Sequence, residues 1–333
     1  MSAVEANGPT KVHAPRRRIG FERYAPAAIL ALAVVAYLAV VIGTGQTQFL
    51  TVDNLIGILN RSIALGITAI GQTFVILVAS IDLSVANLIS VAAVLGSLIM
   101  KGEAGMIVPA IITVLGVGAV VGLVNGLVIT KLQVNPLIAT LGMALLLQGA
   151  LSANFNNFAG SVPDSFKFFA YGEVAGIPFS LIFLALMAAF AWFVLRGTTF
   201  GSNVYSVGGN KDAARFAGIK TDRVVIGCHV ICSMCAALAG LYLAARLGSG
   251  APWIGRDGVY DLESIAVVVI GGTLLAGGRG GVLGTVAGVM IFSLIDSVFN
   301  VAGVDAFAKQ VLRGVIIVAA VALYAARSKR FVA

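Results

Sequence analysis

A carboxylate and two hydroxyls interrupt the apolar sequence at Ser80-Ile81-Asp82-Leu83-Ser84. Acids inside long apolar runs are costly in a membrane and often mark the path of a solute or an ion. Asp82 and Ser84 are therefore candidates for a translocation pathway. The same residues suit a simpler role, because either side chain could cap the helix that is expected to follow. Both interpretations stay open at the level of sequence.

Amide side chains lie within several other apolar runs and could line the same pathway. They are Gln72, Asn87, Asn125, Asn135 and Gln148. An amide can bind the hydroxyls of a small polar solute. It can equally hold two helices together through a hydrogen bond across their interface.

An acid and a base occupy matching depths in two neighbouring apolar runs. Asp296 and Arg313 each lie about five to seven residues from the end of the run that is expected to face outward. An unpaired charge at that depth is costly, and pairing relieves much of the cost. The sequence therefore predicts an intramembrane ion pair.

The longest polar stretch between apolar runs, Arg196 to Arg223, contains a predicted short helix at 211–217. Asn210 can cap it, and Gly218 can end it in the left-handed conformation. Its apolar face consists of Ala213, Phe216 and Ala217, opposite Lys211 and Arg215. Such a face suits a groove in a partner protein, although a loop helix lying on its own bundle would show the same spacing.

Three cysteines and a histidine share one apolar stretch: Cys228, His229, Cys232 and Cys235. We interpret them as a buried helix face and not as a metal site. The chain has no GxxxxGK[ST] phosphate loop, no GxSxG elbow and no HExxH motif. We therefore expect no bound metal or cofactor and no catalytic activity, ATP hydrolysis included.

The composition indicates that these residues are positioned by membrane helices. Of the 333 residues, 59% are hydrophobic and 11% are charged, and the mean hydropathy is +1.02. A helix needs roughly 20 apolar residues to cross a bilayer. The sequence predicts an all-α, polytopic bundle of about ten spans, at 26–45, 55–79, 84–100, 106–130, 135–153, 178–196, 223–245, 262–276, 281–300 and 307–326.

The charge distribution orients this bundle. Of the 22 lysines and arginines, fifteen fall in segments that are cytoplasmic if the N-terminus is inside, four fall in outer segments and three lie within spans. The chain then divides into a basic cytoplasmic tail (1–25), a transmembrane domain (26–326) with a cytoplasmic loop at about 197–222, and a cytoplasmic tail (327–333). Because the charges lie between spans, the net charge of +8 does not indicate a nucleic-acid partner. We interpret the first apolar run as an anchor and not as a signal peptide.

Glycines recur at four-residue intervals in two spans, at Gly118, Gly122 and Gly126 and at Gly280, Gly284 and Gly288. This spacing lets helix backbones approach closely. Packing within one chain is the favoured interpretation, and a subunit interface is the alternative.

In combination, four stretches resemble the permease subunits of bacterial ATP-binding-cassette importers for monosaccharides, the ribose, xylose, arabinose and galactose type. The resemblance covers about residues 54–324. The stretches are Ile81-Asp82-Leu83-Ser84-Val85, Asn135-Pro136-Leu137-Ile138-Ala139-Thr140-Leu141-Gly142, Gly208-Gly209-Asn210-Lys211-Asp212-Ala213-Ala214-Arg215 with Gly218-Ile219, and Ile265 to Gly280 with its glycine pairs. The family usually has glycines around the first stretch, where this chain has Ala79, Ser80 and Ala86.

The resemblance implies a transport subunit of the bacterial inner membrane. It implies a second permease copy, a cytosolic ATPase that uses ATP and Mg²⁺, a periplasmic sugar-binding protein and the surrounding lipid. It also implies that the loop is the coupling segment to the ATPase, formed by Gly208, Gly209, Asn210, Lys211, Asp212, Ala213, Arg215, Phe216 and Gly218. The alternative is a secondary transporter or channel that works without ATP, for which proton coupling would require several acids deep in the spans. Asp296 is the one clear case.

Overall fold

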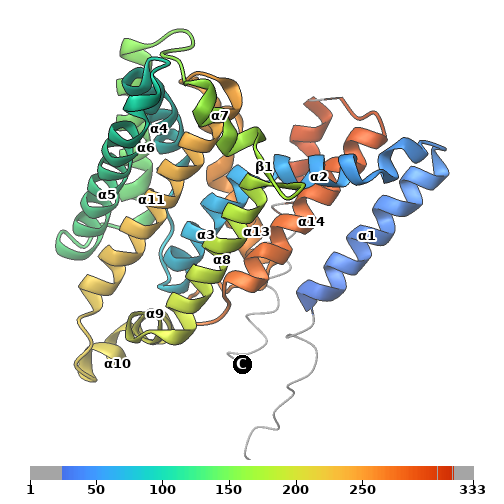
Figure 1. Ribbon diagram of the computed structural model, residues 1–333. Helices are drawn as coiled ribbons and strands as arrows, with labels where there is room; N and C mark the ends of the chain where they lie inside the picture. The colour runs from blue at the N-terminus through green and yellow to red at the C-terminus, as the bar shows by residue number, and fades with distance from the viewer. Residues whose placement is uncertain (1–24, 306, 317, 319–333) are drawn as a thin grey trace, which may run out of the picture.

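The computed structural model describes residues 25–305, 307–316 and 318, and these form an almost entirely helical bundle (Figure 1). The tails predicted at 1–25 and 327–333 lie outside the described residues, apart from Ala25. The helices are α1 (Ala25–Gly43), η1 (Thr47–Leu50), α2 (Val52–Arg61), α3 (Ile63–Leu77), α4 (Val85–Met100), η2 (Ala104–Met106), α5 (Ile107–Lys131), α6 (Pro136–Asn154), α7 (Asp164–Tyr171), α8 (Phe179–Gly197), α9 (Thr199–Gly209), α10 (Lys211–Phe216), α11 (Thr221–Leu247), α12 (Ile254–Asp257), α13 (Tyr260–Ile270) and α14 (Val282–Val301).

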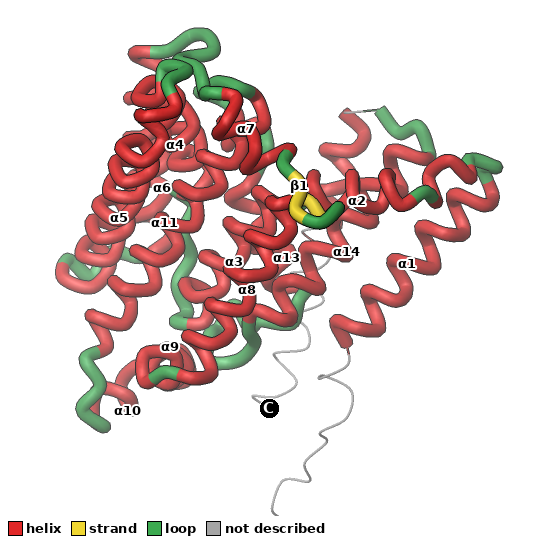
Figure 2. The backbone as a smooth tube through the Cα atoms, in the orientation of Figure 1, coloured by secondary structure: helices red, strands yellow, loops and turns green. Residues whose placement is uncertain are grey.

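In the part of the chain that the structure describes, the strands are confined to a short hairpin between α7 and α8 (Figure 2). Strands β1 (Glu173–Val174) and β2 (Ile177–Pro178) pair antiparallel. The hairpin lies near the end of the bundle opposite α9 and α10. The segments before and after α8 are therefore exposed at opposite ends of the molecule.

Among the described residues, six helices are long and apolar enough to cross a membrane: α5 with η2, and α1, α6, α8, α11 and α14. Helices α2 and α3 count as a seventh if their 44° bend is one broken span. The predicted span 84–100 is the 16-residue helix α4, and the span predicted at 262–276 ends already at Ile270. The span predicted at 307–326 is helical at 307–316, and most of its remainder lies outside the described residues.

Helix α11 forms the centre of the bundle and packs against α3, α4 and α5. Its contact with α5 depends on glycine, because a Cβ atom at Gly122 would lie 2.5 Å from the carbonyl oxygen of His229. Helices α13 and α14 approach in the same way, since a Cβ at Gly288 would lie 2.0 Å from the carbonyl oxygen of Val267. Packing within one chain, predicted from the glycine spacing, is confirmed for both series.

Two irregular segments interrupt the bundle. One connects α3 to α4 at 78–84, and the other connects α13 to α14 at 271–281. Irregular backbone at membrane depth is tolerated where it is buried in protein or lines a cavity. In the first segment Ala79 has φ +58°, a left-handed conformation that favours glycine. The alanine therefore keeps a backbone geometry that a glycine would adopt without strain.

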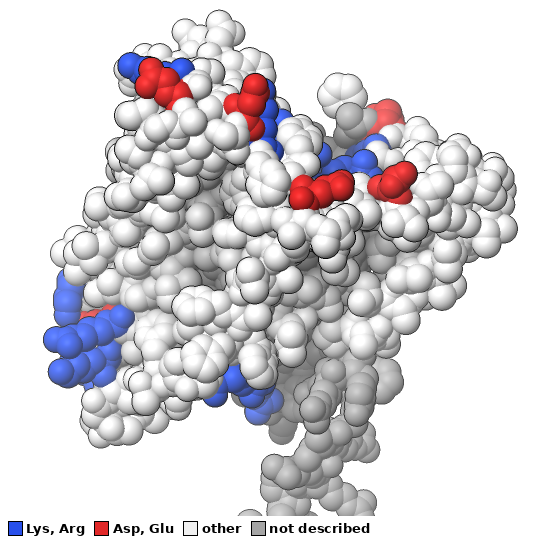
Figure 3. All heavy atoms as spheres, viewed as in Figure 1, with Lys and Arg blue, Asp and Glu red and all other residues white. Residues whose placement is uncertain are grey.

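Charged side chains on the face shown in Figure 3 gather at the two ends of the bundle and leave an uncharged band between them. The end near α9 and α10 is mostly basic, whereas the opposite end carries both signs. This distribution is typical of a helical membrane protein.

Candidate functional site

Helix α10 presents an unpartnered apolar stripe at one end of the bundle. The Asn210 side chain accepts a hydrogen bond from the amide nitrogen of Ala213 at 2.9 Å, and Gly218 has φ +83°. The predicted helix, its cap and its left-handed terminus are thus observed. Phe216 is 92% exposed, and Ala213 and Ala217 are exposed as well. The stripe does not lie on its own bundle.

Helix α9, which precedes the stripe, packs on both irregular segments. A Cβ at Gly208 would lie 1.7 Å from the carbonyl oxygen of Leu77, the last residue of α3. The same oxygen accepts a hydrogen bond from the amide of Gly278 at 2.9 Å. The Tyr205 hydroxyl donates to the carbonyl of Gly280 at 3.0 Å. Burial raises the pKa of Tyr205, and Arg196 opposes this in part, so the hydroxyl remains a donor.

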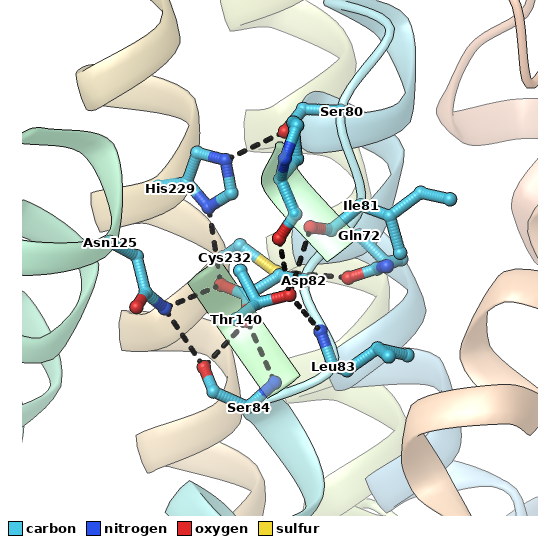
Figure 4. A network of polar contacts seen from close by, with 11 residues as sticks. Gln72, Ser80, Ile81, Asp82, Leu83, Ser84, Asn125, Thr140, His229 and Cys232 are labelled. Carbon is cyan, nitrogen blue, oxygen red and sulfur yellow. Dashed lines mark hydrogen bonds and ion pairs between the residues drawn. The ribbon is translucent and has the colours of Figure 1, made fainter. Parts of the chain in front are cut away.

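A buried polar network surrounds Asp82 where α3 and α4 are joined (Figure 4). One carboxylate oxygen, Oδ1, accepts from the Ser84 amide at 2.9 Å and from the Ser84 hydroxyl at 2.5 Å. The Asn125 amide of α5 donates to Ser84 at 3.0 Å and to Asp82 at 3.4 Å. All three side chains are buried. The network therefore joins the irregular segment to α5.

His229 extends this network into α11. Its Nδ1 lies 3.3 Å from the second carboxylate oxygen of Asp82, and its Nε2 lies 2.9 Å from the Ser80 hydroxyl. A carboxylate only accepts, so Nδ1 carries the hydrogen, and Nε2 and the Ser80 hydroxyl share the second hydrogen bond. Below it on α11, Cys232 donates to the side-chain oxygen of Gln72 at 3.3 Å. Both ring nitrogens of this fully buried imidazole are satisfied.

The structure changes two interpretations of these residues. His229 is a polar bridge between two elements, not only a packing residue. Ser84 is the N-cap residue of α4, yet its side chain makes no capping hydrogen bond, and its hydroxyl turns to Asp82 instead. The signal for His229 was available in the sequence, because a lone imidazole in an apolar helix needs polar partners when it is buried.

The other pathway candidates divide between two places. Asn135 caps α6 by accepting from the Leu137 amide at 2.9 Å, and it is exposed. Asn87 and Gln148 line a separate cavity of about 160 Å³. That cavity is bounded by α4, α6 and α12 and includes Ser152, Phe155, Trp253 and Arg256. No sequence pattern had indicated a role for Trp253 or Arg256.

Asp296 and Arg313 lie together, and a third residue joins them. Arg313 donates to Asp296 at 2.5 Å and to Glu263 of α13 at 2.9 Å. The Glu263 side chain is 8% exposed and that of Arg313 is 32% exposed. Glu263 was missed because α13 had not been placed beside the last predicted span. The arrangement is one cation between two carboxylates.

We expect Arg313→Ala to lower the amount of folded permease and its thermal midpoint more than Asp296→Ala does. The first change leaves two carboxylates without the cation, at a cost on the order of 2 kcal/mol, less than for a fully buried pair. Glu263→Gln in the same chain should restore part of the loss. Size-exclusion yield and thermal melting measure both losses. If the losses from Arg313→Ala and Glu263→Gln simply add in the variant that carries both changes, Arg313 and Glu263 act independently.

A family model described as the branched-chain amino acid transport system permease component matches residues 54–321. The ribose import permease protein of Escherichia coli (strain K12) is 34% identical over 295 residues, 87% of this chain and 91% of that protein. The ribose import permease protein of Bacillus subtilis (strain 168) is 36% identical over 297 residues, 86% of this chain and 89% of that protein. The galactose/methyl galactoside import permease protein of Haemophilus influenzae (strain ATCC 51907 / DSM 11121 / KW20 / Rd) is 34% identical over 305 residues, 86% of this chain and 90% of that protein.

No solved structure matches the chain. The relatives are bacterial, and they are matched over most of their length. Together with the apolar helices, they place the protein in the bacterial inner membrane as a multi-pass protein. Because the family model covers well over half of the sequence, the chain belongs to this family of membrane transport permeases.

Proposed function

We propose that this chain is the membrane-spanning subunit of an ATP-driven importer for a monosaccharide or a related polyol. The observation that carries the proposal is the set of relatives named ribose and galactose import permeases, each matched over most of its length. The family description names branched-chain amino acids, so the substrate class has to be tested directly.

The energy for transport comes, in this proposal, from a separate cytosolic ATPase that uses ATP and Mg²⁺. The absence of a phosphate-binding loop in the sequence and the exposed stripe on α10 support this division of labour. A second copy of the permease and an exported sugar-binding protein complete the assembly. The chain itself transports and carries out no catalysis.

The orientation follows the charges. The N-terminus and the α9–α10 end face the cytosol, and the mixed-charge end faces outward. The basic character of the α9–α10 end supports this orientation, because basic residues are retained on the cytosolic side.

Proteoliposomes test the proposal. The permease is reconstituted with its ATPase subunit and its binding protein, and uptake of radiolabelled D-ribose, D-galactose and L-leucine is measured. We expect sugar uptake that needs both the ATPase subunit and hydrolysable ATP, and no uptake of leucine. Sugar uptake by the permease alone would assign it to the secondary transporters, and uptake of leucine in place of sugar would assign an amino acid substrate.

A further inference from the structure

We infer that the cavity between α4, α6 and α12 is a binding subsite for a neutral monosaccharide on its way through the permease. The inference rests on the proposed function, because it assigns a place in this chain to the transported sugar. The cavity holds about 160 Å³. One water molecule needs only about 10–15 Å³ of such space, so the cavity has room for a solute the size of one sugar ring.

The walls of the cavity are fixed to one another. Helix α12 lies directly on α4: the Gly255 amide donates to the Ser90 hydroxyl at 2.9 Å, and a Cβ at Gly255 would lie 1.7 Å from the carbonyl oxygen of Ala86. Asn87 of α4 donates to the carbonyl of Ala144 of α6 at 2.9 Å. These contacts hold three elements around one space and make the cavity a built feature of the fold.

A backbone bridge joins the two chain segments that flank the cavity residues Phe155 and Trp253. Ala159, in the segment after α6, and Gly250, in the segment before α12, exchange two backbone hydrogen bonds of 2.8 and 3.0 Å. The glycine is required there, because a Cβ at Gly250 would lie 2.4 Å from the Cα atom of Val94. The segments that carry Phe155 and Trp253 are therefore held in register.

The polar groups of the cavity are free to bind a ligand. Asn87 is 8% exposed, and its nitrogen is used by Ala144, which leaves its side-chain oxygen as an acceptor. Gln148 and Ser152 lie one helical turn apart on the same face of α6. Within the described part of the chain, neither side chain makes a hydrogen bond. Amides and hydroxyls both donate and accept, as the hydroxyls of a sugar do.

Two aromatic side chains line the cavity together with these groups. Trp253 and Phe155 both line the cavity and are partly buried. Phe158 packs against Trp253 edge to face, with ring centroids 5.2 Å apart and an angle of 67°. A sugar ring has an apolar C–H face beside its ring of hydroxyls. A cavity lined by both aromatic and amide side chains offers contacts to the C–H face and to the hydroxyls of such a ring.

The charges favour a sugar over an amino acid. Arg256 is the one charged residue among those that line the cavity, and its Nε lies 3.3 Å from the carboxylate of Asp257. Among the described residues no carboxylate lines the cavity, so the ammonium group of an amino acid would lose water there without gaining a charged partner. A neutral polyol needs no such partner.

Intrinsic fluorescence tests binding without requiring transport. The sequence has two tryptophans, and Trp192 on α8 is 46% exposed, so Trp192→Phe leaves Trp253 as the reporter. The purified full-length variant is titrated with D-ribose, D-xylose, L-arabinose and D-galactose, and with L-leucine. We expect a saturable change in Trp253 emission with at least one sugar, of millimolar affinity, and none with leucine. Saturation by leucine alone, or by none of the four sugars, would overturn the inference.

Gln148→Ala should weaken that affinity roughly tenfold, the effect of one lost hydrogen bond of about 1.4 kcal/mol. The matched control is Asn154→Ala at the end of the same helix. The Asn154 side chain donates a hydrogen bond to the carbonyl of Ala150, one turn earlier in α6. Equal affinities in the two variants would overturn the inference. Sugar uptake that persists in proteoliposomes while Trp253 stays silent would refute the subsite and leave the proposed function intact. Failure of uptake with a normal Trp253 response would refute the proposed function and leave the subsite intact.

Discussion

Replacing Phe216 by aspartate is expected to detach the ATPase subunit from the permease. Phe216 is 92% exposed, so the change removes little contact within this chain and should leave its thermal midpoint nearly unchanged. In a docked complex the aspartate would bury a charge against apolar surface. The loss of a central aromatic contact costs about 2 kcal/mol or more, which is roughly thirtyfold in affinity. Co-purification of the ATPase and ATP-driven uptake should both fall.

The conservative variant Phe216→Leu serves as the control for this prediction. Leucine keeps an apolar side chain on the stripe with Ala213 and Ala217, so retention of the ATPase should stay within a few fold of the wild type. If Phe216→Asp retains the ATPase as well as Phe216→Leu does, α10 is not the docking helix. Lys211 and Arg215 lie at the rim of the stripe. Replacing them should instead change the rate at which the ATPase subunit associates with the permease and the salt dependence of that rate.

Helix α10 could be predicted because its determinants are local. The Asn210 cap, the left-handed Gly218 and the spacing of the apolar stripe all lie within nine residues of sequence. Capping and helix periodicity act over this range. What the stripe contacts is a separate matter, and the sequence left it open between a partner and the bundle itself. The exposure of Phe216 decides against the bundle.

The polar network could be predicted only in part. The break at Ser80 to Ser84 and the amide of Asn125 were identifiable as polar groups in apolar runs. Their meeting with His229 depends on the packing of α11 against α3, α4 and α5, which joins residues 147 positions apart. No local pattern carries that information. The same holds for Glu263, which accepts a hydrogen bond from Arg313, 50 positions later in the sequence.

The cavity between α4, α6 and α12 could also be predicted only in part, for a different reason. Asn87 and Gln148 were candidates because an amide stands out in an apolar run. Trp253 and Arg256 come from a connecting segment with no strong periodicity, between α11 and α13. Their position is set by the close approach of Gly255 to α4. A single glycine in the sequence does not predict such a tertiary contact.

Replacing Gly208 by alanine is expected to block transport while the ATPase stays bound. A Cβ atom there would lie 1.7 Å from the carbonyl oxygen of Leu77 and 2.6 Å from the amide nitrogen of Gly278. Backbone atoms cannot rotate away as a flexible side chain can, so α9 must shift from both irregular segments. Leu77 immediately precedes the segment that carries Asp82. A movement of α9 driven by the ATPase would therefore reach the buried network through this contact. We expect uptake to fall more than tenfold, whereas the docking stripe on α10 remains exposed and retains the ATPase within about twofold.

The neighbouring residue provides a matched control, because a Cβ at Gly209 would meet no atom within 4 Å. Gly209→Ala adds the same methyl group to the same helix, and neither glycine has a positive φ. It should leave uptake, ATPase retention and the thermal midpoint close to the wild-type values. Equal uptake by the two alanine variants would show that the close approach of α9 to Leu77 is not needed for coupling. Loss of the bound ATPase from Gly208→Ala would contradict the separation between a docking helix, α10, and a transmitting helix, α9. The expected pattern, a bound ATPase whose hydrolysis no longer drives uptake, would support transmission from α9 to the end of α3.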